Sequence, residues 1–272
     1  MLEKLTYINH MNESMEFGNR GLYANYSELR NYAWNYDVQL GRIVGFQGEV
    51  TEKTLPVVIL CDSEDMGISM KNSLLEIPEK DILSKKAGKL YIGDYYLRCY
   101  IIGGKRENYL EDKRYLQTTL TIVTDYPFWI YEKVYNFSQS QITSTDNKKY
   151  TYKYAYRYAN GLSSMDIIND HYTECNFLMH IYGPVTKPLV VIGGHQYFMN
   201  IVLEEGEYLE IDSITETIVK VMVSGIRINS FHYRDKKNSI FRKIQTGRQI
   251  VSWSGKFDFD VTLYQERSEP KW

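Results

Sequence analysis

The segment from Val251 to Tyr264 alternates apolar and polar residues without a break. A period of two is typical of a strand that buries one face and leaves the other in water. The residues on the apolar face are Val251, Trp253, Gly255, Phe257, Phe259, Val261 and Leu263. Chain ends fray unless something holds them, so a core strand this near the C-terminus predicts an all-β domain whose last strand closes a sheet. We therefore expect a scaffold or binding protein rather than an enzyme.

Length, composition and charge narrow the class of protein. A chain of 272 residues with 43% hydrophobic and 24% charged residues is typical of a globular protein, and its length favours two domains. No apolar run is long enough to cross a bilayer, and the N-terminus lacks the pattern of a secretion signal. The net charge of −2 argues against electrostatic binding of nucleic acid, which needs an excess of Lys and Arg.

The cysteines and histidines predict neither a metal nor a cofactor. Cys61, Cys99 and Cys175 are widely spaced and set in apolar sequence, which predicts reduced core cysteines of a protein that folds in a cytosol. No cysteine pair has the spacing of a zinc site. The histidines show no pair at ligand spacing; they are His10, His171, His180, His195 and His232.

Tyrosine is unusually frequent, with 25 residues in the chain. It favours strands, where it buries its ring and leaves its hydroxyl in water. The run from Tyr150 to Tyr158 places tyrosine at every second position, so one strand face would be wholly tyrosine. Such a face could stack sugar rings or pack against another sheet or subunit. We favour the packed face, because subunit interfaces are also rich in tyrosine.

Only one segment has the period of a helix. Asp62 or Ser63 is suited to be its N-cap, and Pro78 is expected to end it, because proline interrupts helical hydrogen bonding. Residues 81–86 are expected to form a further short turn that ends at Gly88. The apolar face of the helix is expected to be core; it consists of Met66, Met70, Leu74 and Ile77.

Short strands are expected over the rest of the chain. Gly93-Asp94 suits a type II′ hairpin turn, and Gly193-Gly194 is a second turn. Pro127 marks the best candidate for a domain boundary, and residues 136–149 have the polar composition of a linker. The expected strands include Leu5–Ile8, Met15–Phe17, Trp34–Leu40, Arg42–Phe46, Pro56–Leu60, Leu90–Ile92, Tyr95–Leu97, Tyr115–Val123, Phe177–Tyr182, Leu189–Ile192, Tyr197–Leu203, Tyr208–Asp212 and Ile218–Val223. Their regular spacing in the second half favours a β-sandwich.

The chain carries no clear catalytic motif. It has no Gly-x-Ser-x-Gly elbow. Gly103-Gly104 lacks the remaining residues of a phosphate loop and is expected to end a strand, with a polar loop over Lys105–Arg114. Asp258 and Asp260 have the spacing of two carboxylates on one strand face, which would suit glycoside hydrolysis. We favour two solvated charges on an outer sheet face, because residues two apart on a strand rarely flank one bond.

Asn229, His232 and Arg234 form a weak sugar-binding pattern. His232 and Arg234 are two positions apart, close to Asn229. A charged surface loop is the favoured interpretation. From the residues alone we therefore assign no catalytic, cofactor-binding or metal-binding residue, and the residues of any interface stay unknown.

Several segments, taken in order, resemble the distal tail protein (Dit) family of tailed bacteriophages, of the siphophage type. The resemblance covers most of the chain and depends on the order of the segments and on the Ser-Glu-Pro-Lys-Trp ending. No single motif is as specific as a metal signature. The segments are Gly88–Leu97, Asn176–Pro188, Gly206–Asp212, Val251–Tyr264 and Arg267–Trp272.

The resemblance implies a mainly β protein with two domains. Residues 1–130 would form a β-barrel-like or sandwich-like domain with one helix, which makes a hexameric ring that continues the tail tube. Residues 131–272 would form a galectin-like β-sandwich. Galectins bind sugar through a His, Asn and Arg set and a Trp, but here Trp253 lies on the inward face and His232 and Arg234 lack the intervening pattern. A lectin fold is therefore expected without lectin chemistry.

The resemblance also implies a structural virion protein, not an enzyme, at the tail tip or baseplate and assembled in the host bacterial cytoplasm. Its partners would be further copies in a homo-hexamer, the tail tube protein, a tail-tip protein such as a tail-associated lysin or fibre, and, as a further candidate, the tape measure protein. Genomic DNA would pass the ring only as cargo, which suits a near-neutral charge, and no membrane partner is implied. The alternative is a carbohydrate-binding adhesin module that contacts the host surface.

Overall fold

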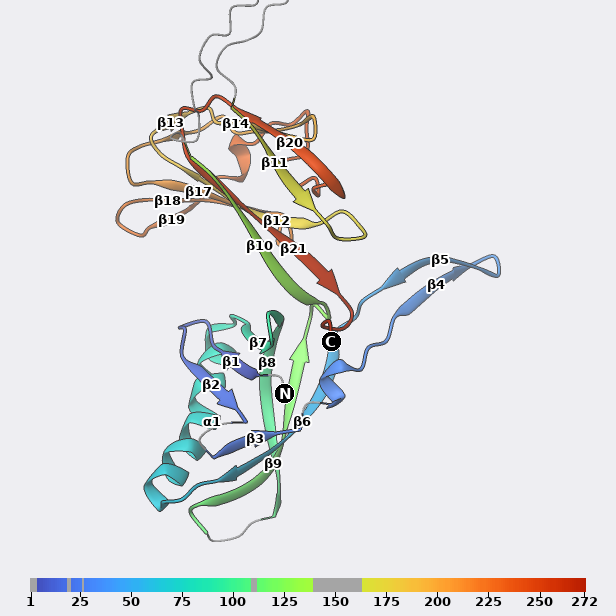
Figure 1. The fold of residues 1–272 in the computed structure, drawn as a ribbon, viewed down its shortest axis with the longest axis vertical. Coiled ribbons are helices and arrows are strands. Elements are labelled where there is room, and N and C mark those ends of the chain that lie inside the picture. Colours follow the sequence, from blue (N-terminus) through green and yellow to red (C-terminus); the bar gives the residue numbers. More distant parts are fainter. Residues whose placement is uncertain (1–3, 19–20, 26, 109–111, 139–162) are drawn as a thin grey trace, which may run out of the picture. The chain divides into compact units, whose positions relative to one another are not determined.

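The computed structural model describes residues 4–18, 21–25, 27–108, 112–138 and 163–272. The chain divides into two compact units. Unit 1 comprises Met1–Tyr131 and Glu266–Trp272, and unit 2 comprises Glu132–Gln265. The described residues are mainly β-strand with one α-helix, and they form antiparallel sheets without a closed barrel (Figure 1). The expected mainly β fold with one helix is confirmed, and the barrel alternative for the first half is not found in these residues.

The chain passes between the units twice, each time inside a strand. β10 (Trp129–Phe137) leaves unit 1 after Tyr131, and β21 (Phe259–Arg267) returns to it at Glu266. From the sequence, residues 131–272 were expected to form one domain. In the structure the C-terminal tail, Glu266–Trp272, belongs to unit 1. That each unit is an independent domain stays a prediction. The tyrosine run at 150–158 and most of the expected linker lie outside the described residues.

Side-chain contacts explain why the C-terminal tail belongs to unit 1. Trp34 Nε1 donates a hydrogen bond to Ser268 Oγ at 3.1 Å. The buried Arg30 donates from Nη1 to Glu269 Oε1 at 3.2 Å, and its guanidinium carbon lies 3.9 Å from the centroid of the Trp272 ring. An Arg that loses its hydration on burial needs such partners. These contacts join residues far apart in sequence, so no local period could indicate them.

Unit 1 contains two larger antiparallel sheets that share β8, and β4 and β5 form a separate two-stranded sheet. One larger sheet has the order β2-β1-β7-β8-β10, and the other has the order β8-β9-β6-β3. The elements are β1 (Leu5–Ile8), β2 (Ser14–Phe17), β3 (Leu22–Ala24), η1 (Ser27–Arg30), β4 (Asn35–Gln39), β5 (Arg42–Gln47), β6 (Thr51–Leu60), α1 (Glu64–Ser84), β7 (Gly88–Ile92), β8 (Tyr95–Asn108) and β9 (Tyr115–Thr124). The β7–β8 hairpin turns at Gly93, whose φ of 58° suits the predicted glycine turn.

β8 is longer than the sequence predicted. Its first part pairs with β7 as far as Cys99, and its second part pairs with β9 from Tyr100 onwards. The register shifts between Ile101 and Gly103, which marks a bulge. Bulges bend a strand, so β8 can pass from one sheet to the other. The expected strand end at Gly103-Gly104 is therefore wrong, because β8 continues to Asn108.

Pro56 also lies inside a strand rather than at its start. β6 begins at Thr51, and β3 pairs only with the residues from Val57 to Ile59. The Pro56 carbonyl accepts from the Asn25 amide at 2.9 Å, just beyond the end of β3. On the β3 side, the nitrogen of Pro56, which lacks an N–H, therefore faces no paired strand. Proline is tolerated at such positions in a sheet.

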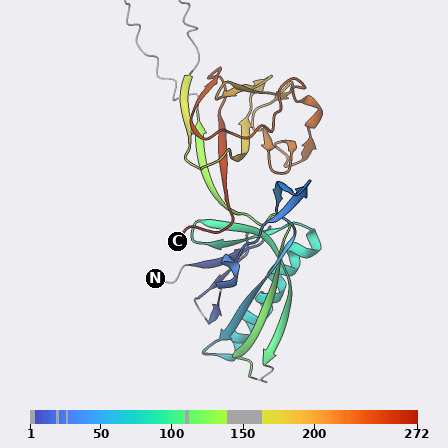
Figure 2. The same cartoon turned by 90° about the vertical axis from the view of Figure 1, so that its right-hand side faces the viewer.

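α1 runs alongside the long strands of unit 1 (Figure 2). Ser63 is its N-cap, as predicted, and Ser63 Oγ accepts from the Met66 amide at 3.3 Å. The helix continues through Pro78 to Ser84, and its C-cap Lys85 adopts a left-handed conformation with φ of 53°. The expected end at Pro78 is wrong, although an interior proline costs about 3 kcal/mol relative to alanine.

The last turn of α1 is held by a buried carboxylate. Asp81 is fully buried, and it accepts hydrogen bonds from the Tyr7 hydroxyl at 2.5 Å and from the His10 amide at 2.9 Å. Burial and the Asp81 hydrogen bond raise the pKa of Tyr7, so its hydroxyl stays protonated as a donor. Hydrogen bonds to a charged group contribute about 1.5–3 kcal/mol each, which offsets the cost of the proline.

Unit 2 is a sandwich of two antiparallel sheets. One has the order β19-β18-β17-β12-β21-β10, and the other has the order β11-β20-β14-β15. Its remaining elements are β11 (Ser163–Asn169), β12 (Asn176–Tyr182), β13 (Val185–Thr186), β14 (Leu189–Ile192), β15 (His195–Phe198), β16 (Val202–Leu203), β17 (Tyr208–Asp212), β18 (Thr217–Val221), β19 (Arg227–Asn229), η3 (Phe231–Tyr233) and β20 (Gly247–Trp253). The expected Tyr197–Leu203 strand is split between β15 and β16.

The alternating C-terminal segment forms two strands rather than the one expected. β20 ends at Trp253 and β21 begins at Phe259, and Gly255 in the turn has a φ of 70° that favours glycine. The Trp253 indole donates to the Phe257 carbonyl at 3.1 Å across this turn. The apolar residues all remain buried, because β20 and β21 belong to the two sheets that enclose one core.

Candidate functional site

The described residues contain no group of three or more His, Cys, Asp or Glu side chains placed to hold a metal ion. Cys61, Cys99 and Cys175 are buried, as predicted for core cysteines, and their thiols are free. Burial raises the pKa of the Cys99 thiol, which disfavours a reactive thiolate. No helix in the described part of the chain is long and apolar enough to cross a membrane.

Asp258 and Asp260 differ in their surroundings, although the Asp258 carbonyl still accepts from the Tyr182 amide of β12 at 3.0 Å. Asp258 lies in the exposed turn before β21, whereas Asp260 is partly buried within β21. Asp260 accepts from the Tyr182 hydroxyl at 2.5 Å and lies 3.1 Å from His180 Nδ1. Burial and the Asp260 carboxylate raise the pKa of Tyr182, so its hydroxyl remains a donor. Asp260 is thus part of a hydrogen-bonded network rather than one of two solvated charges.

That network continues over the outer face of β21, β12 and β17. Glu210 Oε2 lies 3.9 Å from His180 Nε2, and Glu210 Oε1 accepts from Arg227 at 2.7 Å. The ring centroids of His180 and Tyr208 are 5.7 Å apart. This cluster was not predicted from the sequence; its signal was the pair His180 and Tyr182, two positions apart in β12. Because its charged groups already pair with one another, the cluster is a closed network rather than an open ligand site.

Asn229, His232 and Arg234 do not converge on a site either. Asn229 Oδ1 accepts from the Phe231 amide at 3.0 Å. Arg234 donates from Nη1 to the Phe231 carbonyl at 2.8 Å, and its guanidinium carbon lies 3.7 Å from the centroid of the Phe231 ring. These contacts brace η3, while His232 is exposed beside them. Trp253, the other residue of the sugar-binding pattern, is buried in the core.

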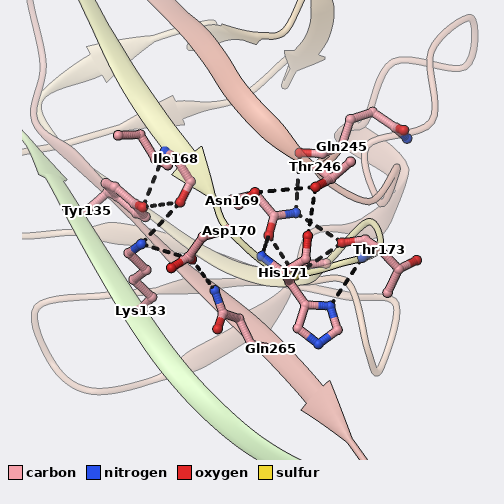
Figure 3. Close-up of polar contacts among 11 residues, drawn as sticks. Lys133, Tyr135, Ile168, Asn169, Asp170, His171, Thr173, Gln245, Thr246 and Gln265 are labelled. Atoms are coloured by element: carbon pink, nitrogen blue, oxygen red, sulfur yellow. Dashed lines mark hydrogen bonds and ion pairs between the residues drawn. The ribbon is translucent and has the colours of Figure 1, made fainter.

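A polar network joins β10, β11 and β21 of unit 2 (Figure 3). Asp170 Oδ1 accepts from Lys133 Nζ at 3.0 Å and from Gln265 Nε2 at 2.7 Å. The Lys133 hydrogen bond lowers the pKa of Asp170, which keeps this carboxylate ionised. The Tyr135 hydroxyl donates to the Ile168 carbonyl at 2.5 Å. Both strands that carry the chain between the units are therefore tied to the same short segment of unit 2.

The buried Asn169 completes this network. Its Nδ2 donates to the carbonyls of Ile244 at 3.0 Å and Gln245 at 3.2 Å, and its Oδ1 accepts from the His171 amide at 3.1 Å (Figure 3). An amide with its donors and acceptor satisfied in this way is a structural group. The network therefore stabilises unit 2 and carries no sign of catalysis.

The β4–β5 hairpin of unit 1 exposes an apolar face. It forms a two-stranded sheet that pairs with no other described strand, and it projects from the ribbon of unit 1 (Figure 1). Its register places Tyr36 opposite Phe46 and Val38 opposite Ile43, so these side chains share one face. Each of the four is more than half exposed, and Leu40 at the turn is fully exposed. We call these five residues the hairpin face.

Unit 1 also has an apolar groove between α1 and the strands β8 and β9, with a volume of about 350 Å³. Leu75 of α1, on its wall, is 65% exposed. Gly104 faces the groove, because it pairs with Leu120, and an added Cβ there would meet Leu120 Cδ2 and Thr118 Oγ1 at 3.4 Å. Its apolar lining includes Leu74, Leu75, Ile82, Ile102, Leu116 and Leu120. We call this feature the α1 groove.

Solved structures match almost the whole chain. A chain of the phage P2 baseplate in its activated conformation with Ca has a TM-score of 0.61 at 16% identity, covering 99% of this chain and 100% of that chain. The Dit protein of phage SPP1, a hub of the adsorption apparatus in phages that infect Gram-positive bacteria, has a TM-score of 0.55 at 7% identity, covering 98% and 100%. This chain has the fold of a phage Dit hub protein.

A second phage p2 baseplate structure, with Sr, has a TM-score of 0.57 at 18% identity, covering 96% of this chain and 97% of that chain. The Dit fold therefore extends over both units, and the resemblance inferred from the sequence is confirmed at the level of the fold. No protein-family model matches the chain, and no curated protein matches it by sequence.

Proposed function

We propose that this chain is a structural virion protein of a tailed bacteriophage, a distal tail or baseplate hub component. In this proposal it forms a hexameric ring that joins the tail tube to the tail tip and the host-recognition apparatus. The observation that carries the proposal is the likeness to phage baseplate and Dit hub chains over nearly the full length of both partners. Because one fold can serve many functions, the surfaces of the molecule must agree with it.

The surfaces favour assembly over catalysis. The polar clusters of unit 2 are saturated by their own hydrogen bonds and ion pairs, whereas unit 1 exposes the hairpin face and the α1 groove. The net charge of −2 suits a ring through which DNA passes, because a strongly basic channel would retain DNA by counterion release. We therefore propose that the protein is not an enzyme.

The partners proposed for the ring are the tail tube protein on one side and a tail-tip protein, such as a tail-associated lysin or fibre, on the other. The tape measure protein is a further candidate, and DNA is cargo only. The virion tail tip is the proposed location, after assembly in the host cytoplasm.

The ring is tested with the full-length chain, alone and co-expressed with the tail tube and tail-tip proteins of the same phage. We expect light scattering to give the mass of a hexamer and negative-stain images to show sixfold rings in at least one condition. A chain that stays monomeric in every condition contradicts the ring.

The alternatives of adhesin and hydrolase are tested separately. We expect the full-length chain to release no product from peptidoglycan or capsular polysaccharide. Turnover that Asp260→Asn abolishes would show an enzyme. Selective binding on a glycan array that Tyr182→Phe abolishes would favour the carbohydrate-binding adhesin.

A further inference from the structure

Basic side chains gather in one loop of unit 2, residues 234–243. Five of these ten residues are basic and one is acidic, although the whole chain has a formal net charge of −2. Protein surfaces usually intersperse charges of both signs, because neighbouring like charges repel. A segment that keeps like charges together therefore points to a partner of opposite sign. We call this segment the basic loop; its basic residues are Arg234, Lys236, Lys237, Arg242 and Lys243.

The basic loop is fixed on the sandwich by apolar and main-chain contacts. Ile240 is buried in the core of unit 2. The Tyr197 hydroxyl donates to the Arg242 carbonyl at 2.7 Å. His195 Nε2 lies 2.7 Å from the Ser239 carbonyl oxygen. These anchors use the main chain of the loop, so they hold it in place without engaging its lysine side chains.

The basic loop also covers the edge of the four-stranded sheet. β15 is the last strand of that sheet, and the Asp235 amide donates to the Phe198 carbonyl of β15 at 3.2 Å. Met199, directly after β15, forms an isolated bridge with Arg234. Lysine on a sheet edge often serves to prevent strand pairing. Here main-chain bonds already cover the edge, so the lysines of the loop are not needed for that purpose.

Three lysines of the basic loop have no partner among the described residues. Lys236, Lys237 and Lys243 are exposed, and within the described part of the chain their ammonium groups make no hydrogen bond or ion pair. The acidic side chain of the loop, Asp235, is already engaged. It accepts from the Lys237 amide at 3.0 Å and from the Asn238 side chain at 3.1 Å. The loop therefore presents uncompensated positive charge to solvent.

The two arginines of the loop are less available than the lysines. The guanidinium carbon of Arg234 lies 3.7 Å from the centroid of the Phe231 ring, and Arg242 Nη1 lies 3.4 Å from His195 Nδ1. The free cations are thus all lysines. Lysine binds phosphate as a point charge, whereas the planar fork of arginine suits bidentate pairing with a carboxylate.

We infer that the basic loop binds a phosphodiester polymer of the host cell surface, a flexible chain of phosphate groups without nucleobases. That the polymer belongs to the host rests on the proposed tail-tip location, whereas the binding itself does not require the ring. Several lysines on one fixed loop can contact successive phosphates of such a chain, and each contact adds an ionic interaction that releases counterions.

The composition of the loop favours this polymer over a protein or a nucleic acid. The centre of a protein interface is depleted in charged residues and in lysine, but the exposed residues of the loop are all polar or charged. Single-stranded nucleic acids bind on open aromatic rings. The aromatic residue of the loop, Phe241, is half-buried and packs against Phe231 with ring centroids 6.0 Å apart. It therefore offers no platform for a nucleobase.

Binding of the full-length chain to poly(glycerol phosphate) tests the inference. Biolayer interferometry with the immobilised polymer is run over a series of NaCl concentrations. We expect binding at low salt that weakens as salt rises, because each phosphate contact releases condensed counterions. With three lysines in contact, the logarithm of the association constant should fall against the logarithm of the salt concentration with a slope of about −2.

Replacing the three free lysines tests whether the loop is the site. The triple variant Lys236→Gln, Lys237→Gln and Lys243→Gln should bind about tenfold more weakly at low salt and should lose most of the salt dependence. Its melting temperature should not change, because these side chains are exposed. Arginine at the same three positions keeps the charge and should keep wild-type binding, which a merely structural role of lysine would not predict.

A charge-matched control removes three cations elsewhere. Lys85, Lys86 and Lys105 are exposed in unit 1. Their combined replacement by Gln changes the net charge by the same amount, and it should leave binding of the polymer unchanged. A loss of binding equal to that of the loop variant would show an effect of net charge and would overturn the assignment to the loop.

Two comparison ligands test the chemistry of the polymer. Hyaluronate carries carboxylates in place of phosphates, and oligo(thymidylate) carries phosphates together with nucleobases. We expect both to bind more weakly than poly(glycerol phosphate). Equal or tighter binding of either one overturns the assigned ligand, as does a wild-type chain that fails to bind poly(glycerol phosphate) at low salt.

The outcomes also separate this inference from the proposed ring. Binding is measured on the full-length chain whether or not it assembles. Polymer binding by a chain that never forms rings would leave the inference standing while the hexamer fails. Rings that do not bind the polymer would overturn the inference and leave the proposed hub function standing.

Discussion

Two segments of this chain alternate apolar and polar residues, and they differ in what covers the apolar side. In unit 2 every apolar residue of the alternating segment from Val251 to Leu263 is buried. In unit 1 the pairs Tyr36–Phe46 and Val38–Ile43 share one face of a hairpin and are exposed. The comparison teaches that a period of two predicts a two-faced strand but does not identify the layer that covers the apolar face.

The physical difference is the presence of a second sheet. β20 and β21 belong to opposite sheets of one sandwich, so each covers the apolar side of the other. The ring of Phe259 stacks on that of Phe137 at 4.6 Å and meets that of Trp253 at 5.3 Å between centroids. The β4–β5 hairpin has no second layer in its own chain.

The largest expected effect lies in the buried alternation. Trp253→Ala and Phe259→Ala each remove a large buried side chain, which costs about 3–5 kcal/mol. Because the two rings touch, the double variant should be non-additive. Urea unfolding followed by hydrogen exchange should show that unit 2 unfolds first while unit 1 keeps its protection and still forms rings. Ile250→Ala, exposed on β20, is the control. Loss of both units together would contradict their independence.

The next effect concerns the contacts that the C-terminal tail makes with Arg30 and Trp34, just before the β4–β5 hairpin. Deleting residues 268–272 removes the Ser268 partner of Trp34, which precedes β4, and the Glu269 partner of Arg30. Hydrogen bonds to a charged group contribute about 1.5–3 kcal/mol, so unit 1 should lose stability of that order. Hydrogen exchange should increase in β4 and β5. Lys271→Ala, an exposed site in the same tail, should change neither quantity. The earlier boundary at 130 would also discard this tail, so a fragment ending there should be destabilised.

A smaller effect depends on pH and belongs to unit 2. Glu207 is buried beside Lys220 at 2.6 Å, and the Lys220 hydrogen bond lowers the pKa of Glu207 in the folded state. The contribution of Glu207 to the free energy of unfolding is therefore complete above the pKa of about 4.3 that Glu has in an unfolded chain. It is lost as the pH falls through the lower pKa of Glu207 in the folded state. In urea titrations from pH 6 to 3, Lys220→Met should flatten this acid loss in unit 2. An unchanged slope would exclude the pair as its source.

The smallest expected effect is on the exposed hairpin. Leu40→Ser should change the free energy of unfolding of the monomer by less than about 0.5 kcal/mol, because the side chain contacts only solvent there. A thermal melt at low protein concentration measures this. A large loss of stability in the monomer would mean that Leu40 is already packed, and the contrast with Trp253 would then disappear.

Much of the fold was predictable from local signals. The Ser63 cap, the Gly93 turn and the period of most strands depend on neighbouring residues, and each was found where predicted. The errors lie where distant groups decide. Asp81 keeps α1 intact beyond Pro78, and β9 pairs with β8 beyond Gly103. The partners of Asp260 come from another strand, so its hydrogen bonds could not be inferred from its own neighbourhood.

The sequence by itself determined which residues of each strand face an apolar layer, because side chains alternate along any extended backbone. It also determined the mainly β class and, through the order of its motifs, the Dit fold. Only the tertiary structure decided that the C-terminal alternation is divided between two sheets, that the tail belongs to unit 1, and that the hairpin face remains exposed. Those outcomes depend on contacts between residues far apart in the chain, whose free energies are not encoded in any local period.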